Sequence, residues 1–269
     1  MTQSAKLGLA RELAVVLGHF FPELTVWLGD IRDPRQSGRA VFPMKVLLLL
    51  GVLMFLAHTG SRNHFNDNVR DALEMAKTMA RLLGCDLKAL PHLDTLEKVL
   101  RLVNPDALEV LLAKLIRRLI RMKALDDWRV GGRFLLAIDG TGLYSFRNRH
   151  CEHCIEAHHD SGAVTYSHKV LVAFIVSDNG YALPIACEFV ENPLEHVYSH
   201  NPVAFKGYFM LMLTAHIVQQ LITRGRLGTV FKSAFHTFLH YGKQMLEALK
   251  NQYLPPDLDP PGQIRLSTA

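Results

Sequence analysis

One aspartate, Asp139, lies in the part of the sequence with the clearest capacity for chemistry. It follows the apolar run 134–138, which predicts a buried strand over 133–139, and it precedes Gly140-Thr141-Gly142. A carboxylate at the carboxyl end of a buried strand is a frequent ligand for a metal ion or a phosphate, because ligands bind at that edge of open α/β sheets. The alternative is that Asp139 forms an Asx-type turn that simply ends the strand.

A second candidate is a cluster of cysteine and histidine residues further along the same stretch. Cys151 and Cys154 have the two-residue spacing that lets both sulfur atoms reach one tetrahedral zinc ion, and His158, His159 or His168 could complete the shell. A second Cys-x-x-Cys pair is absent, so a polar surface loop with two free thiols is the alternative. A redox pair is disfavoured because these cysteines do not open a helix after a strand.

The third candidate is a basic helix. Asn104-Pro105 is typical of an N-cap followed by proline at the first helical position, and leucines recur on one face of the helix that follows. Cations lie on or beside the other face: Lys114, Arg117, Arg118, Arg121 and Lys123. These residues predict either a solvated surface, with cations favoured near the C-terminal end, or a contact surface for the DNA backbone.

Helical periodicity dominates the sequence on both sides of this central stretch. The expected helices are 4–18, 21–28, 43–57, 64–83, 95–102, 105–123, 205–224 and 230–250. Asp94 is the expected cap of the helix 95–102.

Between these helices, apolar runs predict strands at 170–176 and 183–190, joined by the hairpin signal Asn179-Gly180. Both runs are apolar on both faces, which predicts central strands covered by helices. Pro184 predicts an edge position or a bulge at that point.

Composition sets wider limits. The 269 residues are 49% hydrophobic and 20% charged, with a net charge of +5 that mildly favours a polyanionic partner. Lys6, Arg11 and Glu12 interrupt any signal-peptide core, and the apolar run 46–57 is too short to span a bilayer. We therefore expect a cytoplasmic protein with no membrane partner. Four cysteines in a chain of this length do not predict a disulfide framework.

Several of these motifs, taken in order, resemble bacterial insertion-sequence transposases of the DDE type. The resemblance rests on 137–141, 150–154, 165–168 and 183–189, and it extends to 48–62, 194–202 and 263–266. It implies an RNase H-like fold that cleaves DNA and transfers strands at element ends with two Mg²⁺ ions held by three carboxylates. In such a site one ion activates the attacking oxygen and the other stabilises the leaving one. The first of the three carboxylates falls on Asp139.

The sequence also departs from that family. The family's second Asp and catalytic Glu belong to a long segment that is missing here, because Asn192-Pro193 passes directly into Leu194-Glu195-His196. Glu195 matches a family position beyond the catalytic Glu, so it does not take that role. A lone carboxylate holds Mg²⁺ weakly. We therefore expect a truncated, catalytically impaired transposase that binds DNA, the intact enzyme or itself.

The predicted fold class is α/β (α+β), a mostly helical chain around a partial RNase H-like sheet of about three strands. The predicted regions are an N-terminal helical, DNA-binding part at 1–128, the first half of the catalytic core at 129–193 and a helical part at 194–269.

Two other functions are compatible with the residues. One is a non-enzymatic DNA-binding module stabilised by Zn²⁺. The other is a phosphotransferase or phosphatase with Asp139 as nucleophile, which is disfavoured because Ala137 and Thr141 stand where such enzymes need a second Asp.

Overall fold

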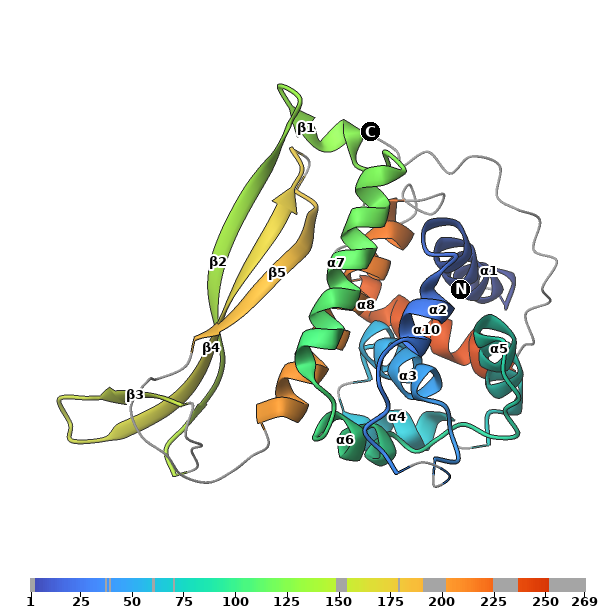
Figure 1. Cartoon of the computed structure of the whole chain (residues 1–269), viewed down its shortest axis with the longest axis horizontal. Helices are drawn as coiled ribbons and strands as arrows, with labels where there is room; N and C mark the ends of the chain where they lie inside the picture. Colours follow the sequence, from blue (N-terminus) through green and yellow to red (C-terminus); the bar gives the residue numbers. More distant parts are fainter. Residues whose placement is uncertain are drawn as a thin grey trace.

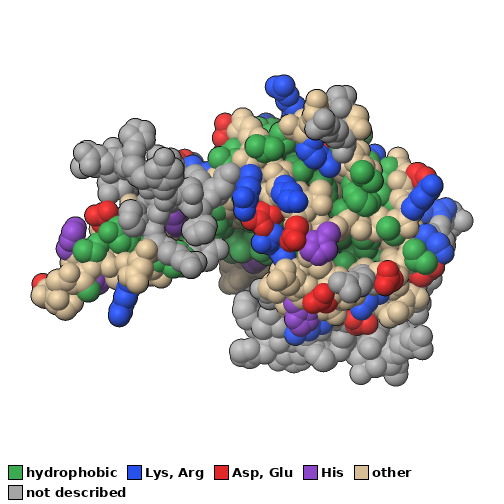
Figure 2. All heavy atoms as spheres, turned by 90° about the horizontal axis from the view of Figure 1, so that it is seen from below, with side chains coloured by type: hydrophobic (Ala, Val, Ile, Leu, Met, Phe, Trp, Pro, Cys, Tyr) green, Lys and Arg blue, Asp and Glu red, His purple; other side chains and the backbone are tan. Residues whose placement is uncertain are grey.

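A computed structural model of the chain describes residues 3–36, 38, 40–59, 61–69, 71–148, 154–178, 180–190, 202–224 and 237–251. A body of packed helices lies beside a long, twisted antiparallel sheet (Figure 1). Viewed from below, the sheet projects from the helical body (Figure 2). The expected mixture of helices and strands is thus confirmed, while the division into three regions stays a prediction.

The helical body contains almost all of the helices that periodicity predicts. In chain order they are α1 (Gln3–Phe20), α2 (Leu24–Gly29), α3 (Met44–Leu56), α4 (Arg62–Val69), α5 (Leu73–Leu83), α6 (Leu93–Leu100), α7 (Pro105–Arg121), α8 (Pro202–Arg224) and α10 (Thr237–Asn251). A short 3₁₀ turn, Asp126–Trp128, follows α7. The centre of the body is α3, which is apolar and buried almost all round and packs against α2, α6 and α8.

The caps of these helices differ in part from expectation. Asn104 caps α7 as predicted, because its side-chain oxygen accepts a hydrogen bond from the backbone N–H of Asp106 at 3.0 Å. The cap of α6 is His92 rather than Asp94, since its Nδ1 lies 3.3 Å from the backbone nitrogen of Asp94. The single helix expected over 64–83 is wrong: Asp71 adopts a left-handed conformation with φ of 59°, which no α-helix continues through.

The sheet contains three long strands and two short ones among the described residues. They are β1 (Arg129–Val130), β2 (Arg133–Phe146), β3 (Ile155–His158), β4 (Val164–Val176) and β5 (Ala182–Val190). Every pairing is antiparallel: β4 is central, with β2 on one side and β3 and β5 on the other, while β1 pairs with the start of β2.

The predicted hairpin between the last two strands is confirmed. Ser177 donates its backbone N–H to the carbonyl of Tyr181 at 2.9 Å, and Gly180 has a φ of 82°. Ala186 pairs with Ala173 and Pro184 with Phe174, so one residue of β5 bulges out between them. Proline cannot donate a ladder hydrogen bond, which explains why the irregularity lies at Pro184, in a strand that pairs only with β4 among the described residues.

Two expectations about the strands are wrong. The first long strand does not end at Asp139, because β2 continues to Phe146 and pairs with β4 through both glycines, Gly140 and Gly142. Helices also do not cover the sheet on both faces: α7 and α8 pack against β5, while Leu171 of β4 is 43% exposed and Ile138 of β2 is 73% exposed. Sequence periodicity reports that both faces are apolar, but a face is buried only where another element lies on it.

None of the helices in the described ranges combines the length and apolar character needed to cross a bilayer.

Candidate functional site

Asp139 lies in the middle of β2, on the side of the sheet that faces the helices. Its partner in β4 is Val172, which in turn pairs with Cys187 of β5, and residues paired across antiparallel strands point to the same face. Val172 and Cys187 are buried, 3% and 7% exposed, whereas Asp139 is exposed because the helices lie over β5 rather than over β2.

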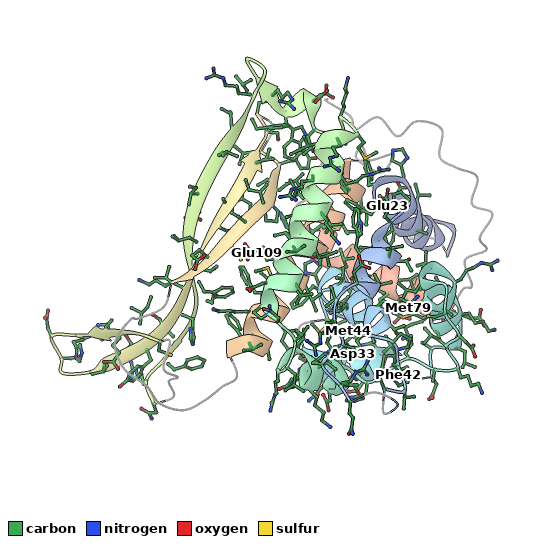
Figure 3. The ribbon with its side chains drawn as sticks, in the orientation of Figure 1. Glu23, Asp33, Phe42, Met44, Met79 and Glu109 are labelled. Carbon is green, nitrogen blue, oxygen red and sulfur yellow. The ribbon has the colours of Figure 1, made fainter. Side chains whose placement is uncertain are left out.

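The residues level with Asp139 do not supply oxygen ligands for Mg²⁺. Its neighbours across the sheet are a valine and a thiol, and burial raises the pKa of the Cys187 thiol to about 12. Glu109 of α7, turned toward the sheet (Figure 3), adds to that increase through its negative charge. No group of three His, Cys, Asp or Glu residues that could hold a metal ion occurs in the described part of the chain. The described donor set therefore does not fit a two-metal site.

Cys154 and His168 are the two candidate zinc ligands that the fold brings together. The Cys154 Sγ lies 3.4 Å from the His168 Nε2, and the cysteine is only 5% exposed. His168 also packs its ring against that of Phe205 in α8, with centroids 6.0 Å apart. The contact joins the end of the Cys/His segment to the start of β4 and to the helical body.

The other candidate ligands lie elsewhere or outside the described residues. His158 stands at the far end of β3, exposed, with its Nε2 3.8 Å from the carboxylate of Glu156. His159 contacts the Thr165 hydroxyl at 2.9 Å. Cys151 falls within 149–153, which lie outside the described residues. Among the described residues, the fold thus brings together two side chains of the types that bind zinc, whereas a tetrahedral site needs four.

The basic face of α7 separates into two groups in the structure. Lys114 and Arg118 are half-buried and form ion pairs at 3.4 Å with Asp30 and Glu23, which flank α2. Glu23 is labelled in Figure 3. Arg117, Arg121 and Lys123 are exposed, and no ion pair is recorded for them within the described ranges. The sequence does not reveal this division, because the partners of Lys114 and Arg118 lie more than 80 positions away.

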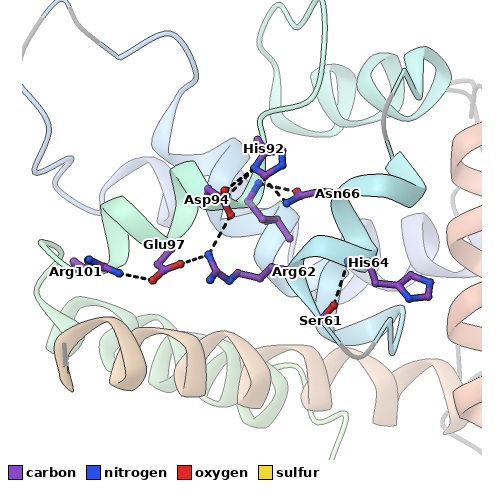
Figure 4. Close-up of polar contacts among 9 residues, drawn as sticks. Ser61, Arg62, His64, Asn66, His92, Asp94, Glu97 and Arg101 are labelled. Carbon is purple, nitrogen blue, oxygen red and sulfur yellow. Dashed lines mark hydrogen bonds and ion pairs between the residues drawn. The ribbon is translucent and has the colours of Figure 1, made fainter. Parts of the chain in front are cut away.

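A polar cluster at the start of α4 was not anticipated as a set. Arg62 forms ion pairs with Glu97 and with Asp94, and Glu97 also binds Arg101 at 2.6 Å (Figure 4). The hydrogen bond from Arg101 is the main reason why the pKa of Glu97 is lowered. These carboxylates are neutralised by arginines, so the cluster fastens α4 to α6 rather than offering a metal site.

Comparison with known proteins bears on the helical body. Residues 26–116 match the family model described as DDE_Tnp_1-associated. This segment is thus similar to a domain associated with DDE-type transposases. The matched segment runs from α2 through most of α7 and includes the polar cluster around Arg62, but it does not reach the sheet or Asp139. No curated protein and no solved structure matches the chain.

Proposed function

We propose that this chain is a transposase-derived DNA-binding protein in which the catalytic core is reduced to its opening strands and is catalytically impaired. The observation that carries the proposal is the match of residues 26–116 to a transposase-associated family. The meander of β2, β4 and β5, with Asp139 exposed on β2, is compatible with the start of an RNase H-like core.

The side chains next to Asp139 support the proposed impairment. Mg²⁺ retains several of its waters and needs more than one anionic oxygen to remain bound. The partners of Asp139 across β4 and β5 are Val172 and Cys187, neither of which is such a ligand. A strand-transfer assay with Mg²⁺ and the DNA ends of the element is expected to yield no product. Metal-dependent product that disappears in Asp139→Ala would overturn the impairment while leaving the transposase relationship intact.

DNA binding would use the exposed cations of α7. Arg117 and Arg121 lie four residues apart on one side of the helix and are exposed, so they can reach phosphates without breaking an ion pair to any described residue. Lys114 and Arg118 are engaged by Asp30 and Glu23 and would contribute less.

This division gives a matched test. Each phosphate contact contributes about 0.9 to the slope of log K against log salt concentration. The Arg117→Gln/Arg121→Gln variant is expected to lower that slope by about 2, while Lys114→Gln/Arg118→Gln changes it less. The wild-type chain failing to bind DNA in a salt-dependent manner, or the two variants behaving alike, would overturn the assignment of α7.

The contact between Cys154 and His168 favours a second candidate, a non-enzymatic module stabilised by zinc. A zinc ion held by these residues and by further Cys or His ligands would fasten the residue that precedes β3 to β4. Elemental analysis should then find zinc in the wild-type protein and in Cys85→Ser, whose thiol lies in the helical body, but not in Cys154→Ser. Equal zinc contents in the two serine variants would exclude this site.

A further inference from the structure

The outer edge of β2 is the longest unpaired strand edge among the described residues. On one side β2 pairs with β4 from Leu135 to Phe146. On the other side, among the residues that the structure describes, only Arg133 and Phe134 are paired, with the two residues of β1. The backbone beyond Phe134 therefore presents N–H and C=O groups that can accept another strand.

This edge lacks most of the devices that commonly protect such strands. Between Leu135 and Phe146 the sequence contains no proline and no lysine, and Asp139 is its one charged residue. Several large apolar side chains along it are exposed, among them Leu136 at 61% and Ile138 at 73%. One irregularity is present, a β-bulge between Gly142 and Tyr144. The regular part of the free edge thus covers residues 135–142.

We propose that this edge pairs antiparallel with the same edge of a second copy of the chain, about a two-fold axis at Ile138. A two-fold axis perpendicular to a sheet pairs one central residue with its own counterpart, because paired residues must point to the same face. With Ile138 at the centre, the pairing runs from Leu135 to Thr141 on each copy.

The axis is placed at Ile138 because the two adjacent positions for it, Ala137 and Asp139, are less favourable. An axis at Asp139 would set two carboxylates directly opposite each other, which is unfavourable. An axis at Ala137 would shorten the pairing, because β1 already occupies Arg133 and Phe134. With the axis at Ile138, each Asp139 faces Ala137 of the other copy. The bulge after Gly142 then bends the strand at the point where it reaches β1 of the other copy.

The proposed contact places the most exposed large apolar residue of the sheet against its own counterpart. Ile138 points to the face opposite Asp139, together with its β4 partner Ala173, so the outer faces of the two sheets become continuous. This dimer does not depend on DNA binding or on transposition, so the dimer and the proposed function can fail separately.

A single cysteine substitution tests the register. Directly opposed residues in an antiparallel pair have Cα atoms about 4.5–5.5 Å apart, within disulfide range. Ile138→Cys is therefore expected to form a disulfide-linked dimer under mild oxidation. Leu136→Cys is the matched control, since it lies on the same face but about 13 Å from its counterpart, four residues away along the strand. Equal cross-linking of the two variants, or none in Ile138→Cys, would overturn the register.

Sedimentation equilibrium tests the interface itself. At about 100 μM, where a micromolar Kd is saturated, the wild-type chain is expected at twice its 30.3 kDa mass. Ile138→Lys sets two ammonium groups opposite each other and should give a monomer. Val41→Lys, at a position 84% exposed in the helical body, should remain dimeric. A monomeric wild-type chain would refute the proposal. This holds even if another segment of the same chain protects the 135–141 amides from hydrogen exchange.

Discussion

The helical body and the sheet differ in how completely they bury what their sequences present. In the body, α3 is apolar and covered on almost all sides, so that Leu47, Leu48 and Leu50 have no exposed surface. In the sheet, β2 also contains a run of apolar residues, yet Leu136 and Ile138 are mostly exposed. The helical body buries its apolar surface among its own helices, whereas the sheet leaves an apolar face and a strand edge uncovered by the described residues. The family match falls within the helical body.

The largest expected effect tests this contrast with the same substitution in both regions. Leu50→Ala removes a fully buried side chain and is expected to lower the free energy of unfolding by about 2–5 kcal/mol. Leu136→Ala, at 61% exposure, should change it by less than about 0.5 kcal/mol. Urea unfolding of the two variants measures both values. Similar losses would show that the outer face of the sheet is covered in solution.

Close helix packing supplies the next prediction. A Cβ atom at Gly207 of α8 would lie 2.8 Å from the Cδ2 of Leu100 in α6, whereas one at Gly142 of β2 would have nothing within 4 Å. Overpacking costs about 1–3 kcal/mol, and the better helix propensity of alanine offsets about 1 kcal/mol of it.

Gly207→Ala should therefore be destabilising and Gly142→Ala neutral or slightly stabilising in the same unfolding assay. A stabilising Gly207→Ala would mean that α6 and α8 approach less closely than described.

The junction between the two regions makes stability depend on pH. His216 of α8 donates from Nε2 to the carbonyl of Ala182 in β5 at 3.1 Å, and burial lowers its pKa below 6.5. At pH values between that lowered pKa and 6.5, the unfolded chain then binds more protons than the folded chain. The contribution of His216 is therefore complete above about pH 7.5 and is lost as the pH falls through this window.

Urea midpoints measured from about pH 7.5 to about pH 5 should fall, and less steeply in His216→Gln. His158→Gln, at an exposed position on β3, is the control and should follow the wild-type curve. An unchanged slope in His216→Gln would remove His216 as the cause.

The smallest effect concerns the ion pairs that attach α7 to α2. Arg118 is 34% exposed and pairs with Glu23, so Arg118→Gln should cost about 0.2–1 kcal/mol, whereas the neighbouring Arg117→Gln should cost nothing measurable. Adding salt should narrow the difference, because exposed ion pairs are screened. A larger cost for Arg117→Gln would indicate a partner for this cation inside the folded chain.

The sequence by itself determined where most helices lie, because the spacing of apolar residues and local signals such as Asn104-Pro105 act over a few positions. It also determined the hairpin at Gly180 and the irregularity at Pro184, since each follows from the backbone chemistry of one residue. The left-handed break at Asp71 was missed, because its sequence carries no glycine to mark it.

The tertiary structure alone decided which groups surround the candidate site residues. Asp139 belongs to the middle of β2 rather than to its end because pairing with β4 keeps the two glycines extended. The separation of Lys114 and Arg118 from Arg117 and Arg121 depends on carboxylates distant in sequence, and so does the contact between Cys154 and His168, which strand register creates. Long-range pairing sets these positions, and local sequence patterns do not contain it.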